Sequence, residues 1–300
     1  MMSTKAESTG ADHVHGQQLS GRGVIVGLDP ALAEEVAVTF DDAFVLTTHG
    51  LEMSDRRVTQ RIVRAYRPDV IVYDLESSAS IGCSTGRSTP QIEEPKRVLA
   101  VRWVVEAAAS VGAHVVLLST SEVFAGMAAQ PSAGWPEWVR PRPQTDRAAS
   151  IAAAEEQLRS SDLLVRLGSL QTETRSRLMT DTCESLRRGM NMELRDDNSG
   201  SVVLAADAAA AIGRLIEEDL RGVFHVANAG VTSDFAFAMA VASEVGGIDL
   251  GGPARFSTCS SAEARLGPAL ATEAIESIGH WPRSVESAIR TSLLSGVRVH

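Results

Sequence analysis

Short runs of apolar residues, many of them β-branched, alternate along this chain with amphipathic stretches of helical periodicity. The runs are apolar at successive positions, as in strands that are covered on both faces. The expected strands are Val24–Val26, Ala43–Leu46, Val70–Tyr73, His114–Ser119, Leu163–Arg166 and Val223–Val226. The expected helices between them are Ala31–Thr39, Asp55–Tyr66, Lys96–Ser110, Asp146–Arg159 and Asp207–Glu218. This order predicts an α/β fold with a Rossmann-like, doubly wound parallel sheet.

The alternation becomes irregular after Arg166. Further helices are expected at Ser176–Gly189, Ser233–Val245 and Pro282–Leu294. We expect them to form a smaller C-terminal substrate-binding subdomain over the carboxyl ends of the strands. The expected division is a disordered leader over 1–20, a core over 21–170 to which 201–227 return, and a subdomain over 171–200 and 228–300.

The composition excludes several classes of function. A net charge of −10 disfavours nucleic acid and anionic membranes as partners, because both are bound by basic surfaces. Cys83, Cys183 and Cys259 are too few and too far apart to indicate a disulfide framework, and no metal site is expected. No apolar stretch reaches the length of a signal sequence core or a membrane span. We therefore expect a cytoplasmic protein.

Several landmarks carry a family resemblance. Residues 119–126 read Ser-Thr-Ser-Glu-Val-Phe-Ala-Gly, residues 67–72 read Arg-Pro-Asp-Val-Ile-Val, and residues 222–226 read Gly-Val-Phe-His-Val. In this order and spacing they resemble the dTDP-4-dehydrorhamnose reductases, which are extended short-chain dehydrogenases/reductases. The resemblance covers about residues 22–295. It implies the extended Rossmann fold and, in active members, NADPH-dependent reduction of a sugar nucleotide.

The catalytic pair of that family departs from the pattern. The family has Tyr-x-x-x-Lys in the helix after the Ser-Thr motif, and this chain has Arg147 and Ile151 there. The Tyr donates a proton and the Lys lowers its pKa; loss of a general acid typically costs roughly 10²–10⁴-fold in rate. No Tyr-x-x-x-Lys occurs anywhere in the chain. All its tyrosines and lysines are Tyr66, Tyr73, Lys5 and Lys96.

The cofactor loop departs as well. The family's Gly-x-x-Gly-x-x-Gly begins at Gly27, but Pro30 and Ala33 occupy its second and third glycine positions. Asp29 followed by Pro30 is typical of a capped helix N-terminus. Its carboxylate would satisfy the free N–H groups and repel a diphosphate. The acidic Asp74 and Glu76, where the family has an Asn-Ala-Ala-type segment, disfavour the cofactor further.

Thr120 remains from the family's catalytic set, either vestigial or repurposed. The candidate ligand-binding cleft comprises Ser119, Ser121, Glu122, Val123, Phe124, Trp135, Trp138 and Arg166. Three of these have alternative interpretations. Arg166 either holds an anionic group or pairs with a local acid, and Trp135 and Trp138 either stack on a ligand or anchor their loop. His225 is expected to be a packed strand histidine.

Three functions are compatible with these residues. The first is a non-catalytic homologue that binds a protein partner or a nucleotide-sugar-like ligand; the regulatory β subunit of methionine adenosyltransferase, which resembles these reductases, is a precedent. The second is a redox-neutral enzyme using Thr120, Glu122, Asp146 or Arg147. The third is a 4-ketoreductase with an unusual proton donor. No cofactor is expected except NADP(H) under the third. A homodimer through Lys96–Ser110 and Asp146–Arg159 is an open possibility.

Overall fold

The central element of the computed structural model is a parallel sheet. The structure describes residues 19–46, 53, 55–76, 94–172, 175–245, 255–262 and 264–294. In these ranges six strands form a sheet in the order β2-β1-β3-β4-β5-β9, and all their pairings are parallel. Their bounds are β1 Leu19–Val26, β2 Phe40–Leu46, β3 Val70–Asp74, β4 His114–Thr120, β5 Leu163–Leu167 and β9 Gly222–Val226. Each predicted strand lies inside one of them, so the doubly wound fold is confirmed.

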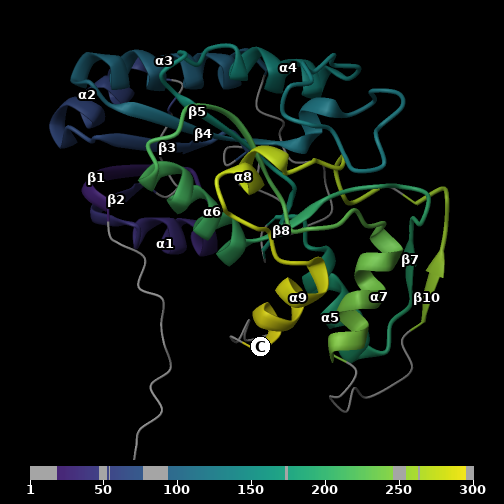
Figure 1. The fold of residues 1–300 in the computed structure, drawn as a ribbon. Coiled ribbons are helices and arrows are strands. Elements are labelled where there is room, and N and C mark those ends of the chain that lie inside the picture. The colour runs from purple at the N-terminus through teal and green to yellow at the C-terminus, as the bar shows by residue number, and fades with distance from the viewer. Residues whose placement is uncertain are drawn as a thin grey trace, which may run out of the picture.

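Helices cover both faces of this sheet (Figure 1). One face carries α2 Arg56–Tyr66, α3 Glu94–Val111 and α4 Asp146–Glu155, and the other carries α1 Pro30–Ala37 and α6 Ala205–Glu217. The helix expected to reach Arg159 ends at Glu155 instead. Its last turn tightens, because Gln157 and Leu158 donate to carbonyls three residues back. Arg159 then pairs with Asp162 at 2.6 Å.

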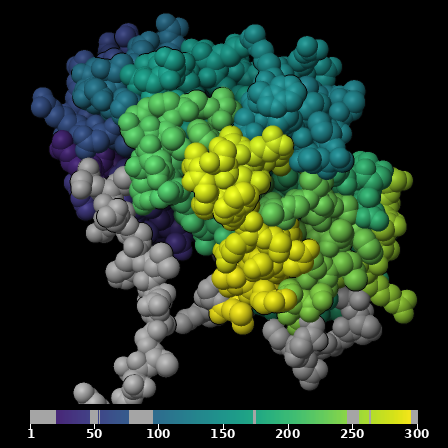
Figure 2. All heavy atoms as spheres, viewed as in Figure 1, coloured from purple at the N-terminus to yellow at the C-terminus, as the bar shows by residue number. Residues whose placement is uncertain are grey.

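A third group of buried apolar side chains lies in the C-terminal part. It is enclosed by α5 Leu178–Arg188, α7 Asp234–Val245 and α9 Val285–Leu294. Two short strand pairs join this part: β6 Ser169–Gln171 with β8 Val202–Leu204, and β7 Met192–Leu194 with β10 Phe256–Thr258. The helix α8 Glu273–Ser277 precedes α9, and both lie on the face shown in Figure 2, in yellow. The three-residue strands β6, β7, β8 and β10 were not predicted from the sequence.

The topology determines where a ligand site is expected. The strand order reverses between β1 and β3, and ligands of open α/β sheets bind at the carboxyl ends beside such a reversal. The chain leaves β1 at Gly27, whose φ of 78° is in the left-handed region that suits glycine. The 3₁₀ turn η2 Ser121–Phe124 follows β4 at the same edge.

Two further properties of the described residues concern membranes and metal ions. Among the helices that the structure describes, none has the length and apolar character needed to span a bilayer. The residues that the structure describes also contain no group of three or more His, Cys, Asp or Glu side chains that could hold a metal ion. Cys183 and Cys259 are free thiols, and Cys83 lies outside the described residues. Of the leader expected over 1–20, residues 1–18 also lie outside them, and the last two were predicted wrongly, because Leu19 and Ser20 begin β1.

Candidate functional site

The turn between β1 and α1 is closed by its own aspartate. Asp29 is buried and caps α1: its Oδ1 accepts a hydrogen bond from the Ala31 N–H at 3.1 Å, and Pro30 occupies the first turn. The predicted capped helix is therefore confirmed. The other oxygen, Oδ2, accepts a hydrogen bond from the Thr172 hydroxyl at 2.7 Å. A carboxylate thus stands where an unmodified phosphate loop would present free N–H groups.

A second contact fastens the end of β3. Asp74 is 1% exposed and pairs with Arg175, whose Nη1 lies 2.5 Å from Oδ2. Burial raises the pKa of Asp74, and the Arg175 guanidinium opposes that rise. Thr172 and Arg175 bond to each other: the Thr172 N–H donates to the Arg175 carbonyl, and the Arg175 N–H donates to the Thr172 hydroxyl. This Thr172/Arg175 turn ties the C-terminal part to the ends of β1 and β3.

Arg147 and Ile151, at the positions of the family's catalytic Tyr and Lys, differ in their exposure to solvent. Arg147 on α4 is 37% exposed, and its Nη2 lies 2.5 Å from Oε2 of Glu76. Ile151, one turn later, is 0% exposed and belongs to the core beneath α4. The helix itself is well formed, because the Thr145 hydroxyl caps it by accepting from the Ala148 N–H. Neither side chain is able to donate a proton as a tyrosine does, since an arginine stays charged at physiological pH.

Polar residues of the predicted cleft gather at the end of β4 and in η2. The Thr120 hydroxyl accepts from the Glu122 N–H at 3.3 Å and caps η2. Burial raises the pKa of Glu122, Arg147 opposes the rise and Glu76 adds to it. Within the described residues, Ser121 Oγ and Glu76 Oε1 are buried without a hydrogen-bond partner. These side chains therefore gather two carboxylates, two hydroxyls and one guanidinium at a single edge of the sheet.

A separate polar network lies inside the fold below that edge. The guanidinium of Arg166 holds both carboxylate oxygens of Glu155, at 3.1 Å from Nε and 2.8 Å from Nη2, and both residues are buried. The Ser119 hydroxyl donates to the same carboxylate at 2.6 Å. Arg166 also contacts Nε2 of His225, and burial together with Arg166 lowers the pKa of His225 to about 3. His225 is thus a neutral, packed strand histidine, as expected.

Several predicted cleft residues consequently do not line an open cleft. Ser119 and Arg166 are committed to the Glu155 network, so the ion-pair interpretation of Arg166 is the one that the structure bears out. Val123 and Phe124 are fully buried, and the Phe124 ring stacks on Trp135 at 5.5 Å. The Phe124 ring also contacts the His225 ring edge-on and lies under the Arg166 guanidinium, so it belongs to the interior of the fold.

The two tryptophans of one loop separate. Trp135 is 7% exposed and anchors the loop through Phe124, whereas Trp138 is 82% exposed. The backbone N–H of Trp135 donates to the Ala269 carbonyl, and the Ala271 N–H donates to the Trp135 carbonyl. Trp135 therefore has the structural role that the sequence left open, and Trp138 faces solvent.

Comparison with known proteins agrees with this architecture. The family model described as "RmlD substrate binding domain" matches residues 21–273. The chain belongs to this family. A dTDP-4-dehydrorhamnose reductase of Mycobacterium tuberculosis is 27% identical over 292 residues, covering 90% of this chain and 93% of the relative. The Bacillus subtilis spore coat polysaccharide biosynthesis protein SpsK is 24% identical over 233 residues, covering 76% of this chain and 78% of the relative.

Solved structures of the same fold extend this relation. A dTDP-4-dehydrorhamnose reductase of Bacillus anthracis, in complex with NADP, superposes with a TM-score of 0.76 at 20% identity, covering 93% of this chain and all of the other. A Thermus thermophilus UDP-glucose 4-epimerase complexed with NAD superposes with a TM-score of 0.68 at 16% identity, covering 92% and 99%. At these identities the likeness shows the fold.

Sequence reasoning missed several residues that shape the site of this RmlD-family chain. Thr172 and Arg175 follow a three-residue strand and carry no local signal. Glu155 is the local acid that one interpretation of Arg166 required, and the sequence alone did not identify it. Gly267 was also missed: a Cβ there would lie 2.7 Å from Ser121 Oγ and 2.9 Å from Glu122 Oε1. Its small size lets the loop from the C-terminal part cover this edge of the cleft.

The Asp29 contact to the C-terminal part has a measurable effect. We expect Asp29→Ala to lower the free energy of unfolding by about 2 kcal/mol, because it removes a helix cap and the acceptor of the Thr172 hydroxyl. Asp55→Ala is the matched control, since Asp55 caps α2 through Arg57 and Val58 and is exposed. Urea unfolding measures both. Equal losses in the two variants would contradict a contribution from Thr172.

Proposed function

We propose that this RmlD-family chain does not reduce its ligand with a nicotinamide cofactor and instead binds a nucleotide-sugar-like ligand in an accessory role. One observation carries the proposal. Arg147, bound to Glu76, and Ile151, buried in the core, stand where the family has its proton-donating Tyr and the Lys beside it. Without a proton donor, hydride delivery to a carbonyl lacks the protonation that completes the reduction.

The cofactor loop supports the same proposal, because its residues do not fit a dinucleotide. A pyrophosphate needs free backbone N–H groups at a helix N-terminus and close approach of the backbone. Asp29 already accepts from the first turn of α1, and the exposed Pro30 lacks an N–H. Asp74 and Glu76 add carboxylates at the end of β3, and the Thr172/Arg175 turn is bonded to Asp29 and Asp74. We therefore assign the cofactor no part in the function.

The unpaired polar atoms of the cleft support a hydroxylated ligand. A buried polar atom without a partner costs about 1–3 kcal/mol, so ligands or ordered water are expected at Ser121 Oγ and Glu76 Oε1. Glu76 and Glu122 offer acceptors for sugar hydroxyls, and the half-exposed Arg147 offers a donor fork for a phosphate or ring oxygen. These groups match the chemistry of a nucleotide sugar.

Two titrations on the full-length protein test the proposal. We expect dTDP-rhamnose to bind with a measurable heat by calorimetry, and NADPH to give neither heat nor enhanced nicotinamide fluorescence up to roughly millimolar concentration. Glu122→Gln, which keeps the shape and removes the charge, should weaken dTDP-rhamnose binding about tenfold, the loss expected for a charge-assisted hydrogen bond. Saturable NADPH binding would refute the proposal. Failure of both ligands would favour a protein partner.

A redox-neutral enzyme is the second candidate, and the raised pKa of Glu122 favours it. A carboxyl whose pKa is raised by burial holds its proton more readily than an ordinary carboxyl, as a general acid must. Chromatography of the incubated nucleotide sugar separates the two candidates. Conversion that disappears in Glu122→Gln would establish an enzyme, and unchanged nucleotide sugar leaves the binding role.

A further inference from the structure

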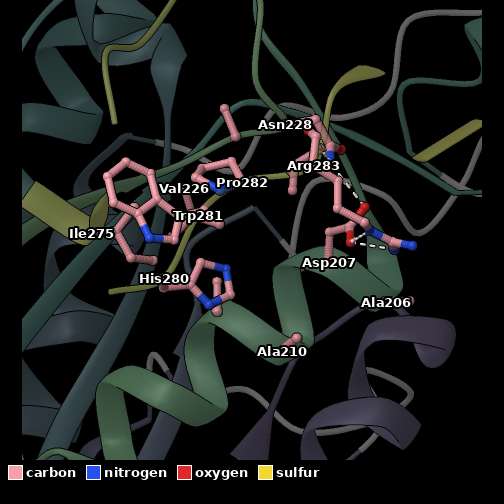
Figure 3. A pocket seen from close by; sticks show the side chains of 13 residues that line it. Ala206, Asp207, Ala210, Val226, Asn228, Ile275, His280, Trp281, Pro282 and Arg283 are labelled. Carbon is pink, nitrogen blue, oxygen red and sulfur yellow. Dashed lines mark hydrogen bonds and ion pairs between the residues drawn. The ribbon is translucent and has the colours of Figure 1, made fainter. Parts of the chain in front are cut away.

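A cavity of about 570 Å³ lies on the α6 side of the sheet, away from the cleft described above. Its walls come from α6, the ends of β8 and β9, Ile275 of α8 and the segment 280–283 (Figure 3). It shares no lining residue with the cleft at Asp29, Asp74 and Glu122. Its volume falls within the roughly 300–1,000 Å³ that small-molecule sites occupy.

Small side chains on one helix make the space. Ala206 and Ala210 are exposed and four residues apart on α6, so they lie above one another on the same face. The residues on the inner face of α6, such as Ala208 and Ile212, are buried against the sheet. A larger residue at Ala210 would project into the cavity without disturbing that packing.

An aromatic ring borders the opposite side. Figure 3 shows Trp281 and His280 together on one side of the cavity, with Ala210 of α6 between them and the Asp207–Arg283 pair. Trp281 is 72% exposed, which leaves most of an indole ring in water. Large apolar rings exposed beside an apolar hollow mark binding sites more often than isolated surface residues do.

The polar side chains on one wall of the cavity, Asp207, Asn228 and Arg283, carry no net charge together. Asp207 accepts from Arg283 Nε at 2.7 Å and from Asn228 Nδ2 at 2.8 Å, and Asn228 Oδ1 accepts from the Leu204 N–H. These groups satisfy one another and neutralise the single carboxylate. The half-buried His280 supplies an imidazole beside the indole, and burial lowers its pKa, so it is neutral at physiological pH.

We infer that this cavity binds a flat, uncharged aromatic small molecule that stacks on Trp281 and forms a hydrogen bond with His280. The stacking buries the exposed indole, the alanine face of α6 accommodates the width of the ligand, and the self-paired Asp207–Arg283 wall gives no advantage to a charged one. The site is independent of the proposed function of the cleft, because the two have no lining residue in common.

The test uses 2-naphthol as the probe and the full chain labelled with 5-fluorotryptophan. The chain has four tryptophans, so fluorine NMR follows each ring, and Trp281→Phe and Trp138→Phe assign two of the resonances. We expect 2-naphthol to shift the Trp281 resonance saturably, with a dissociation constant on the order of 1 mM or below. The saturated, non-planar decahydro-2-naphthol should bind about five- to tenfold more weakly, since it cannot stack.

Variants locate the binding. Ala210→Leu keeps a good helix former at an exposed helix position and should abolish the Trp281 shift while the other resonances stay in place. Trp138→Ala removes the other highly exposed tryptophan of this chain and should leave 2-naphthol binding unchanged. An unmoved Trp281 resonance, equal binding by Ala210→Leu, equal binding of the saturated analogue, or an equal shift at Trp138 would each overturn the inference.

Discussion

Replacing Arg166 by methionine should lower the free energy of unfolding by about 3–5 kcal/mol. Arg166 is 4% exposed and is held by both oxygens of the buried Glu155. Its removal leaves a carboxylate in the core whose remaining partner is the Ser119 hydroxyl. Breaking a buried ion pair from one side is costly because the remaining charge loses its compensation without regaining water.

Urea unfolding at pH 7.5 measures this loss, and two further variants control it. Arg166→Met with Glu155→Leu removes both charges and should recover most of the stability, since a buried pair replaced by apolar groups is often close to neutral. Arg140→Met breaks the exposed Arg140–Glu156 pair and should have no measurable effect. A double variant as unstable as the single one would show that packing, rather than the uncompensated charge, determines the loss.

Arg175→Met should lower the free energy of unfolding by about 3 kcal/mol at pH 8, and the loss should shrink as the pH falls. Burial already raises the pKa of Asp74, and Arg175 is the group that most opposes this rise. Without it, the pKa in the folded state moves further above the value of about 3.9 in the unfolded chain. The folded state then binds a proton more tightly than the unfolded state, so its stability declines as the pH rises through the folded pKa.

Unfolding curves from pH 4.5 to 8, each referred to the unsubstituted protein, measure that dependence. Arg175→Met with Asp74→Asn carries no carboxyl at this position, so its stability difference should be flat across the same range. A flat difference in Arg175→Met itself would contradict the assignment to Asp74. The result matters for the cleft, because the Asp74–Arg175 pair is one of the two contacts through which the Thr172/Arg175 turn ties the C-terminal part to the ends of β1 and β3.

Local patterns predicted the sheet well. The six core strands are runs of apolar residues such as Val70–Tyr73. A strand that is buried on both faces needs apolar side chains at successive positions, so such a run is visible in the sequence. The cap at Asp29 was equally predictable, because it depends on neighbours two residues away. The pairs β6–β8 and β7–β10 were not, since three residues are too few to show a period and their partners lie far along the chain.

The kinds of residue in the cleft could be predicted from the sequence, but their contacts with distant parts of the chain could not. The absence of Tyr-x-x-x-Lys is a property of the sequence, and the buried Ile151 agrees with it. Two contacts hold the C-terminal part against the ends of β1 and β3. Thr172 bonds to Asp29, which lies 143 positions earlier in the chain, and Arg175 bonds to Asp74, which lies 101 positions earlier. Nothing local in Arg175 distinguishes it from the arginines of exposed helices. For the same reason Arg166 kept two interpretations until its distance to Glu155 was known.

The placement of β9 and α6 also affects how the chain is made. β9 completes the sheet beside β5, and α6 covers the apolar side of α1, yet both follow the whole α5–β8 segment in sequence. During synthesis on the ribosome, Leu32 and Val36 of α1 therefore remain without their covering helix until α6 has emerged from the exit tunnel. The nascent chain therefore exposes this apolar surface for most of its translation, and surface of this kind promotes aggregation until it is covered.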